Sequence, residues 1–241
     1  MTDTTLTSTP TVVYLRHVST RLALHQLRAG AGTTRPLLCL HGLGERTPAS
    51  APEYLNAWPG PIWGLDFTGH GDSTVPAGGG YTAEILMADV DHALAHLGET
   101  TVFGRGLGAY VALLIAGARP EMVAGAILAD GPGLAGGGPS PTSPVAVRPA
   151  GVIGAVGGTQ ATPDGYALVE LARDVRPADY AMLYVRQALQ FSGLDEPIAV
   201  VGVVRPPWLA AVAEETGVVT TTLADALHRY AHVQRAPRPP T

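Results

Sequence analysis

The sequence predicts an α/β fold with a mostly parallel central sheet, helices on both faces of that sheet and a cap insertion. Short apolar runs, typical of strands buried on both faces, alternate with longer segments whose apolar residues recur at helical spacing. The composition agrees with this reading, because a chain of 241 residues that is 46% hydrophobic and 15% charged suits one compact domain. The same composition excludes a disordered chain.

The predicted elements follow in order along the chain. Two alternating runs, 12–16 and 22–28, predict an opening antiparallel pair. Six short apolar runs predict the strands of a parallel sheet, at 36–40, 62–65, 100–103, 123–128, 198–203 and 218–221. Helical patterns lie between them at 82–97, 107–119, 208–215 and 222–233. Gly98 and Pro120, which are typical helix-ending residues, follow the first two of these patterns.

One segment interrupts the alternation of strands and helices. Residues 131–162 are rich in Gly, Pro and Ala and predict an irregular loop, which leads into two helical segments at 164–173 and 177–191. We therefore expect residues 1–130 to form the first part of the core, 131–196 a cap or lid, and 197–233 the rest of the core. The Pro- and Arg-rich tail, 234–241, is predicted to be disordered.

Charge and composition exclude several classes of function. The net charge is −5 and no basic stripe is present, so binding of nucleic acid is not expected. All 15 basic residues are arginine, which excludes a Schiff-base lysine and a P-loop lysine. The single cysteine, Cys39, lies in an apolar run and predicts a reduced core residue rather than a disulfide.

The termini and the apolar runs predict a soluble, cytoplasmic protein without membrane contact. The polar first ten residues contain no signal-peptide core, and the longest apolar stretch, 107–118, is too short to span a bilayer. No cofactor is predicted. Two histidine pairs at helical spacing, 92/96 and 228/232, could each hold a metal, but no third ligand is evident, so we predict no metal site.

Three motifs, each beginning in a predicted strand, carry the functional argument: LLCLHGLG at 37–44, LDFTGHGDS at 65–73 and VFGRGLGAY at 102–110. In order, spacing and context they resemble the α/β-hydrolase superfamily over roughly residues 10–130. In that superfamily the third motif is G-x-S-x-G, whose serine occupies a sharp strand-to-helix turn with positive φ. Here Gly106 takes the serine's position, so an acyl-enzyme cannot form through that residue.

The other members of the family's catalytic triad are also missing. No carboxylate occurs in the segment VRPPW at 204–208, where the acid is expected, and no histidine occurs in TTTL at 220–223. These absences predict a natural loss of catalysis. The segments 104–110 and 120–125 are similar to N-myc downstream-regulated proteins, family members that lack the nucleophile and are regarded as non-enzymatic. The similarity covers about twenty residues and implies a shared state, not a shared role.

The superfamily resemblance implies which groups remain at the site. The backbone N–H groups of Leu43 and Leu107 would form an oxyanion hole, which would bind a carbonyl or carboxylate oxygen, or only water. Arg105 would face the pocket and attract an anionic ligand, or form a salt bridge. His41 joins these residues as a ligand-binding candidate, although in the family this imidazole usually hydrogen-bonds to loops.

Three functions follow from these observations. The first is a non-catalytic pseudo-hydrolase that binds a small carbonyl- or carboxylate-containing molecule or a partner. The alternative is a hydrolase of a labile ester or lactone, in which Asp66 or Asp130 activates a water and His70 and the oxyanion hole assist. The non-catalytic interpretation of Asp130 is that its carboxylate caps the Gly-rich turn. The third function is a structural subunit, and the sequence leaves open whether the chain forms a homo-oligomer.

Overall fold

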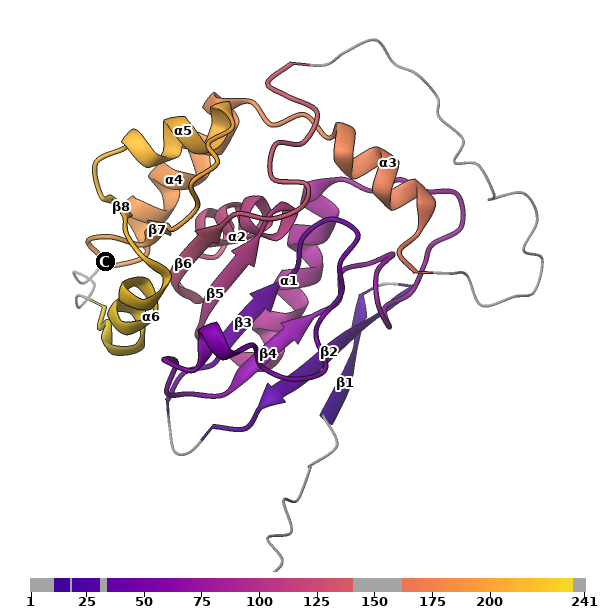
Figure 1. Cartoon of the computed structure of the whole chain (residues 1–241), viewed down its shortest axis with the longest axis horizontal. Coiled ribbons are helices and arrows are strands. Elements are labelled where there is room, and N and C mark those ends of the chain that lie inside the picture. Colours follow the sequence, from indigo (N-terminus) through magenta and orange to yellow (C-terminus); the bar gives the residue numbers. More distant parts are fainter. Residues whose placement is uncertain (1–10, 18, 31–33, 141–161, 236–241) are drawn as a thin grey trace, which may run out of the picture.

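The computed structural model describes residues 11–17, 19–30, 34–140 and 162–235, and an eight-stranded sheet is at its centre (Figure 1). The strand order is β1-β2-β4-β3-β5-β6-β7-β8. The strands are β1 (Thr11–His17), β2 (Thr20–Arg28), β3 (Leu37–Leu40), β4 (Ile62–Leu65), β5 (Thr100–Arg105), β6 (Val123–Ala129), β7 (Ile198–Val200) and β8 (Val218–Thr220). Strand β2 is antiparallel to β1 and β4, and every other pair is parallel.

Helices cover both faces of this sheet. They are α1 (Ala83–Leu97), α2 (Leu107–Ala118), α3 (Gly165–Arg173), α4 (Ala178–Phe191), α5 (Pro207–Glu214) and α6 (Leu223–His232), with a short 3-10 helix η1 (Glu53–Leu55). Helices α1, α2, α4 and α5 pack in a chain of neighbours on one face, whereas η1 and α6 contact each other on the opposite face. The predicted α/β fold with a mostly parallel sheet is therefore confirmed. No helix in the described part of the chain is long and apolar enough to cross a lipid bilayer.

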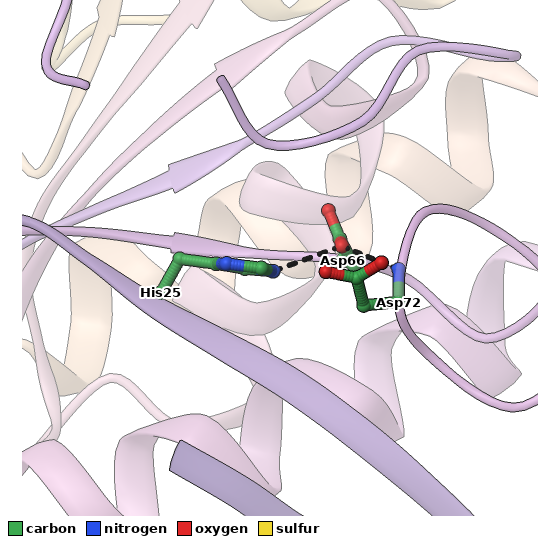
Figure 2. Close-up of side chains that lie close together, drawn as sticks. All are labelled: His25, Asp66 and Asp72. Atoms are coloured by element: carbon green, nitrogen blue, oxygen red, sulfur yellow. Dashed lines mark hydrogen bonds and ion pairs between the residues drawn. The ribbon is translucent and has the colours of Figure 1, made fainter. Parts of the chain in front are cut away.

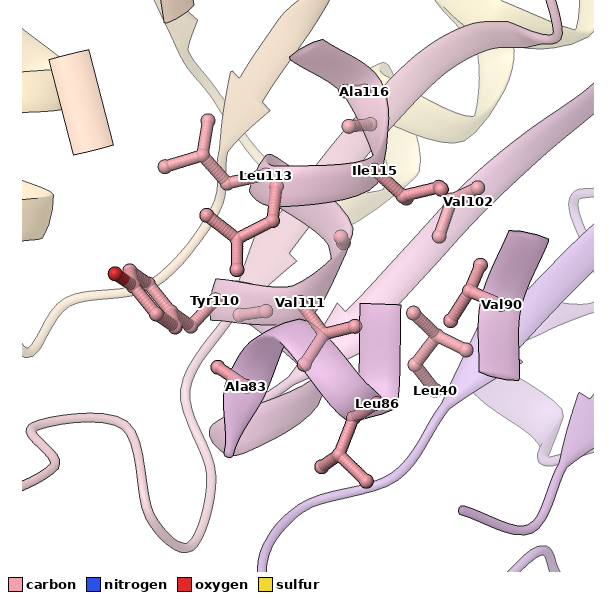
Figure 3. Close-up of a cluster of buried hydrophobic side chains, with 14 of the residues drawn as sticks. Leu40, Ala83, Leu86, Val90, Val102, Tyr110, Val111, Leu113, Ile115 and Ala116 are labelled. Atoms are coloured by element: carbon pink, nitrogen blue, oxygen red, sulfur yellow. The ribbon is translucent and has the colours of Figure 1, made fainter. Parts of the chain in front are cut away.

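The larger apolar cluster lies between the sheet and helices α1 and α2 (Figure 3). Every residue of α2 from Leu107 to Gly117 is buried, which is why this helix is apolar all round rather than amphipathic. Helix α4 approaches so closely that a Cβ on Gly117 would lie 2.5 Å from Cα of Tyr184. A residue without a side chain is therefore required at this crossing.

Each predicted strand and helix occurs, with differences at the ends. The largest difference is in β7, which was expected to run to residue 203 but ends at Val200. The reason is a side chain: the carboxylate of Asp130 accepts hydrogen bonds from the N–H groups of Val203 and Val204, at 2.7 and 3.1 Å. These bonds hold the chain at the end of β6 and divert it from the sheet.

The segment expected to form a cap contains two helices with different surroundings. Helix α3 is held by the loop before α1: Asp164 accepts from the Tyr81 hydroxyl at 2.7 Å, and Glu170 accepts from the Tyr81 N–H at 2.7 Å. Helix α4 packs instead against α2 and α5 in the helical layer (Figure 1). The division of the chain into core and cap remains a prediction, and residues 141–161 of the expected loop lie outside the described residues.

The predicted disordered tail is described only at its first two residues. Arg235 donates a hydrogen bond to the Pro120 carbonyl at 2.7 Å, and its Nε lies 3.6 Å from Glu99. Residues 236–241 lie outside the described residues.

Candidate functional site

Gly106 forms the turn between β5 and α2 with a φ of 58° and a ψ of −119°. This backbone conformation is accessible to glycine without strain and costs other residues about 1–3 kcal/mol. The turn is also tight: a Cβ at Gly104 would lie 2.1 Å from the Gly108 carbonyl oxygen, and one at Gly108 would lie 2.4 Å from the Leu40 carbonyl oxygen. The glycines of the third motif thus permit the sharp strand-to-helix turn.

The N–H groups of Leu43 and Leu107 converge on a single acceptor, which is the carbonyl oxygen of Pro132. The two nitrogen-to-oxygen distances are 3.0 and 2.9 Å. Donor distances of about 2.7–3.1 Å are those of an oxyanion hole around its oxygen. A peptide carbonyl of the chain itself therefore accepts from the two N–H groups that the superfamily resemblance predicts as an oxyanion hole.

The backbone of residues 131–138, here called the plug segment, fills the space above Gly106. A Cβ at Gly106 would lie 2.1 Å from the Pro132 carbonyl oxygen and 2.5 Å from the carbonyl carbon of Gly131. A Cβ at Gly133 would lie 2.6 Å from Cβ of Leu43. The plug segment can pack this closely because the facing positions 106, 131 and 133 carry no side chains.

A buried arginine holds the plug segment in place. Arg176 is about 1% exposed, donates through Nη1 to the carbonyls of Gly133 and Leu134, and stacks over the Tyr110 ring with its Cζ 4.7 Å from the centroid. The Trp208 Nε1–H donates to the same Leu134 carbonyl at 2.9 Å. Backbone bonds between residues 137–138 and residues 174–176 complete the attachment. The plug segment is therefore fixed to the helical layer and not only to the loops.

Both predicted site histidines bridge backbone segments. The Nδ1–H of His41 donates to the Gly42 carbonyl at 2.8 Å, and its Nε2 accepts from the Phe67 N–H at 3.1 Å. This pairing assigns the neutral tautomer, in agreement with burial, which lowers the pKa of His41. The imidazole thus joins the first motif to the second and has no nitrogen left for a ligand.

His70 makes an equivalent bridge on the other side of the second motif. Its Nε2 accepts from the Gly44 N–H and its Nδ1 faces the Thr68 carbonyl, both at 3.3 Å. Burial, and then the neighbouring His41, lower the pKa of His70 to about 4. The side chain is therefore neutral at pH 7 and holds the loop that carries Leu43.

Asp66 is the acceptor at the centre of a compact network (Figure 2). Its Oδ2 accepts from His25 Nε2 at 2.9 Å and from the Asp72 N–H at 2.8 Å, and its Oδ1 accepts from the Thr47 N–H at 2.7 Å. Burial alone would raise the pKa of this carboxyl, but the hydrogen bonds outweigh it and lower the pKa to about 2. His25, Asp66 and Asp72 offer ligand atoms within 4.8 Å of one another, yet a cation would have to displace these donors.

The structure does not bring the two candidate carboxylates together. Asp130 is engaged by the backbone of residues 203–204, as described above, and follows β6, whereas Asp66 follows β4. Strands β3 and β5 separate them, a distance of roughly 14 Å at the usual strand spacing. Asp66 bonds to His25 rather than to His70, the histidine that assists in the alternative hydrolase hypothesis.

Arg105 forms the salt bridge that the sequence left as one of two alternatives. Its Nη1 lies 3.2 Å from Glu45, whose Oε2 also accepts from the Gly42 N–H at 2.9 Å. Arg105 shares a face of β5 with Phe103, two residues earlier, so it points to the face that carries η1. It lies beside the turn at Gly106 but on the side away from α2.

The two histidine pairs at helical spacing make separate contacts. The ring of His92 stacks on His17 at a centroid distance of 4.3 Å, whereas His96 packs edge-on against Trp63 at 6.3 Å. His228 and His232 pack edge to face at 4.9 Å on α6. None of these rings lies among the side chains around Gly106 described above.

Sequence reasoning missed the plug segment and Arg176. The available signal was the run Gly131-Pro132-Gly133, which has no bulky side chain and allows a backbone to approach another backbone closely. Such a run after a strand is typical of a loop, and its position over a third glycine at 106 depends on the tertiary fold.

Comparisons with known proteins identify the fold. No family model matches the chain, and no curated protein matches it in sequence. Among solved structures, an N-formylmaleamic acid deformylase from Pseudomonas putida S16 superposes with a TM-score of 0.59 and 14% identity, over 88% of this chain and 92% of that chain. A thioesterase domain from the curacin biosynthetic pathway superposes with a TM-score of 0.55 and 15% identity, over 93% and 98%. Together with the strand order and the turn at Gly106, these similarities identify the architecture: the chain is an α/β-hydrolase-fold protein.

Proposed function

We propose that this chain is a non-catalytic α/β-hydrolase-fold protein that acts by binding a small molecule or a partner. One observation carries the proposal: the Pro132 carbonyl accepts hydrogen bonds from both Leu43 and Leu107 directly above a glycine at position 106. Glycine stands where the family has its nucleophilic serine. The Pro132 carbonyl oxygen fills the position between the two N–H groups that a substrate oxygen would need.

The remaining groups support the loss of covalent catalysis. Acyl transfer by this fold needs a hydroxyl or thiol, a general base and free oxyanion donors. Position 106 offers no nucleophilic atom, and Nε2 of both His41 and His70 already accepts a backbone N–H. A small carbonyl compound could enter the old centre only if the plug segment moved away.

The test is a search for hydrolase activity in the purified chain. We expect no labelling by a fluorophosphonate probe and no hydrolysis of p-nitrophenyl butyrate above that of the heat-denatured protein. Stoichiometric labelling of any serine, or turnover that the native fold alone provides, would refute the loss of catalysis. Mapping the labelled residue by mass spectrometry would then identify the nucleophile.

The alternative, a hydrolase with a carboxylate-activated water, has weaker support. A carboxylate with a pKa near 2, as at Asp66, is a weak general base at neutral pH. Asp130 accepts two backbone N–H groups and stabilises the end of β7. If turnover is found, Asp66→Asn and Asp130→Asn decide the matter, because unchanged turnover in both variants excludes both residues as the base.

A further inference from the structure

The connection between β3 and β4 leaves one part of the sheet without a helix. Parallel neighbouring strands are usually joined through a helix that covers the sheet. Here the connection, residues 41–61, contains only the three-residue η1. A cavity of about 270 Å³ remains between this connection and the strands, on the face opposite α1 and α2.

The floor of the cavity is made by small and apolar side chains. Cys39 of β3 pairs with Gly64 of β4 on one side and with Phe103 of β5 on the other. All three line the cavity, with Leu27 of β2 beside them. A Cβ at Gly64 would lie 2.3 Å from Cγ2 of Thr47, so the glycine allows the Thr47 side chain to pack against the sheet beside Cys39.

Polar and charged groups lie at the wall and the mouth. Arg46, Arg105 and Glu45 line the cavity, and Tyr54 of η1, about 50% exposed, stands at its edge. Arg105 is paired with Glu45, whereas Arg46 has no ion-pair partner within the described residues. Two guanidinium groups against one carboxylate give the mouth a net positive charge.

One buried polar group also lines the cavity without a partner. The hydroxyl of Thr47, a residue about 7% exposed, makes no hydrogen bond within the described part of the chain. Buried hydroxyl groups normally have a partner, since an unsatisfied one costs about 1–3 kcal/mol. The oxygen atom is shielded from solvent against Gly64, so a ligand or a water in the cavity would reach it only if the Thr47 side chain turned.

We propose that this cavity binds a small aromatic monocarboxylate, with its ring against the edge of the Phe103–Tyr54 pair, whose centroids are 6.1 Å apart, and its carboxylate at Arg46. The apolar walls match an aromatic body, and the unpaired guanidinium at the mouth matches one negative charge. The volume is close to the lower end of small-molecule sites, about 300 Å³, so the ligand is of single-ring size. The inference deepens the proposed binding role and rests on it, but it places the ligand away from the old catalytic centre.

The only cysteine of the chain supplies a reporter within the cavity. Burial raises the pKa of the Cys39 thiol to about 12, so its reaction with a small reagent such as methyl methanethiosulfonate is slow and depends on access. We expect benzoate to slow this reaction further and to raise the melting temperature. At equal concentration benzamide, which lacks the charge, should have a smaller effect on both, and glutarate, which lacks the ring, should have none.

Variants locate the ligand. Arg46→Gln should weaken benzoate binding about fivefold, as expected for loss of one partly exposed ion pair, while Arg186→Gln, on the exposed face of α4, should leave it unchanged. Cys39→Leu should fill the floor and abolish binding measured by calorimetry, whereas Cys39→Ser should retain it. Circular dichroism and the melting temperature establish that each variant is folded.

Three results would overturn the inference: no benzoate binding at millimolar concentration, equal binding of benzamide, or full binding by a folded Cys39→Leu protein. These results are separable from failure of the proposed function. Serine labelling or ester turnover would refute the loss of catalysis and leave the cavity untouched. Absence of benzoate binding would refute the cavity and leave the loss of catalysis standing.

Discussion

Gly106 combines a positive φ with contacts that only a residue without a side chain can make. Its Cβ position lies 2.1 Å from the Pro132 carbonyl oxygen, so the clash is with backbone rather than with a movable side chain. A serine at this one position would therefore meet the same clash. At the scale of the residue, the approach of the Pro132 carbonyl requires a glycine at position 106, because a Cβ there would clash with the carbonyl oxygen.

Substitution of Gly106 tests this coupling. We expect Gly106→Ala to lower the free energy of unfolding by about 3 kcal/mol, the sum of backbone strain and overpacking. Gly98→Ala is the control, since Gly98 also has a positive φ, of 78°, but open space at its Cβ position, so that it should cost only the backbone strain of about 1–2 kcal/mol. Urea denaturation measures both values.

Two outcomes would contradict this prediction. Equal stability losses in the two alanine variants would mean that the plug segment does not fill the space above Gly106. Ester hydrolysis by Gly106→Ser would mean that the plug segment moves aside readily. We expect Gly106→Ser to match Gly106→Ala in stability and to have no activity.

The plug segment is an element without regular secondary structure, and its order comes from contacts with other elements. Arg176, which precedes α4, binds two of its carbonyls, and Trp208 of α5 binds one of them again. Arg176 Nε and Nη2 are buried without hydrogen-bond partners in the described structure, and the Asp174 carboxylate lies 3.9 Å from Nε. A buried charge of this kind is a costly group to retain unless it holds something in position.

Removal of this charge should loosen the plug segment. Arg176→Met keeps a long side chain but removes the donors, and we expect a loss of about 3 kcal/mol in stability, as for hydrogen bonds from a buried charged group. The N–H groups of Leu43 and Leu107 should exchange with deuterium at least about tenfold faster, because they are protected by the Pro132 carbonyl. Hydrogen exchange measured residue by residue checks both the loss of stability and the faster exchange at these two N–H groups.

Arg173→Met provides the matched control, since Arg173 is exposed at the end of α3 and lies close to Arg176 in sequence. Its stability and its exchange at positions 43 and 107 should equal those of the unaltered chain. Unchanged exchange in Arg176→Met would show that Arg176 does not hold the plug segment.

At the scale of the whole molecule, two buried groups make stability depend on pH in opposite directions. Burial lowers the pKa of His70 to about 4, so its stabilising contribution is complete above the unfolded value of about 6.5 and is lost as the pH falls toward 4. Burial raises the pKa of Asp174 to about 6 despite the attraction of Arg176. Its contribution is complete below about pH 4 and is lost as the pH rises through 6.

Between pH 4 and 6 the contributions of His70 and Asp174 to the free energy of unfolding offset each other. A variant that lacks one of the two groups is therefore needed to measure either contribution. We expect the stability advantage of the unaltered chain over His70→Asn to shrink by about 2–3 kcal/mol between pH 7.5 and pH 4.5. In Asp174→Asn the opposite group is removed, and stability should fall more steeply toward acid than in the unaltered chain. Urea denaturation at the two pH values measures each difference in stability. If the difference between the unaltered chain and His70→Asn does not change with pH, the His70 imidazole is not buried as a neutral ring.

Much of the fold was predictable because it depends on local patterns. The cap of α1 at Thr82 and its end at Gly98, and the wholly apolar helix that follows Gly106, are visible in the sequence as spacing and residue type. The turn at Gly106 was predictable for the same reason. The hydrogen-bonding roles of Asp66 and Asp130 were less predictable, because all of their partners except His25 are backbone N–H groups, which no residue type identifies.

By itself, then, the sequence determined the alternation of strands and helices, the glycine at the strand-to-helix turn and the absence of a nucleophile there, since each depends on neighbouring residues. Only the tertiary structure decided what fills the centre and where a cavity remains. The Pro132 carbonyl reaches the Leu43 and Leu107 N–H groups from far along the chain, and the cavity at Cys39 exists because the connection above it lacks a helix. Both depend on how backbones approach one another in space, which side-chain patterns do not encode.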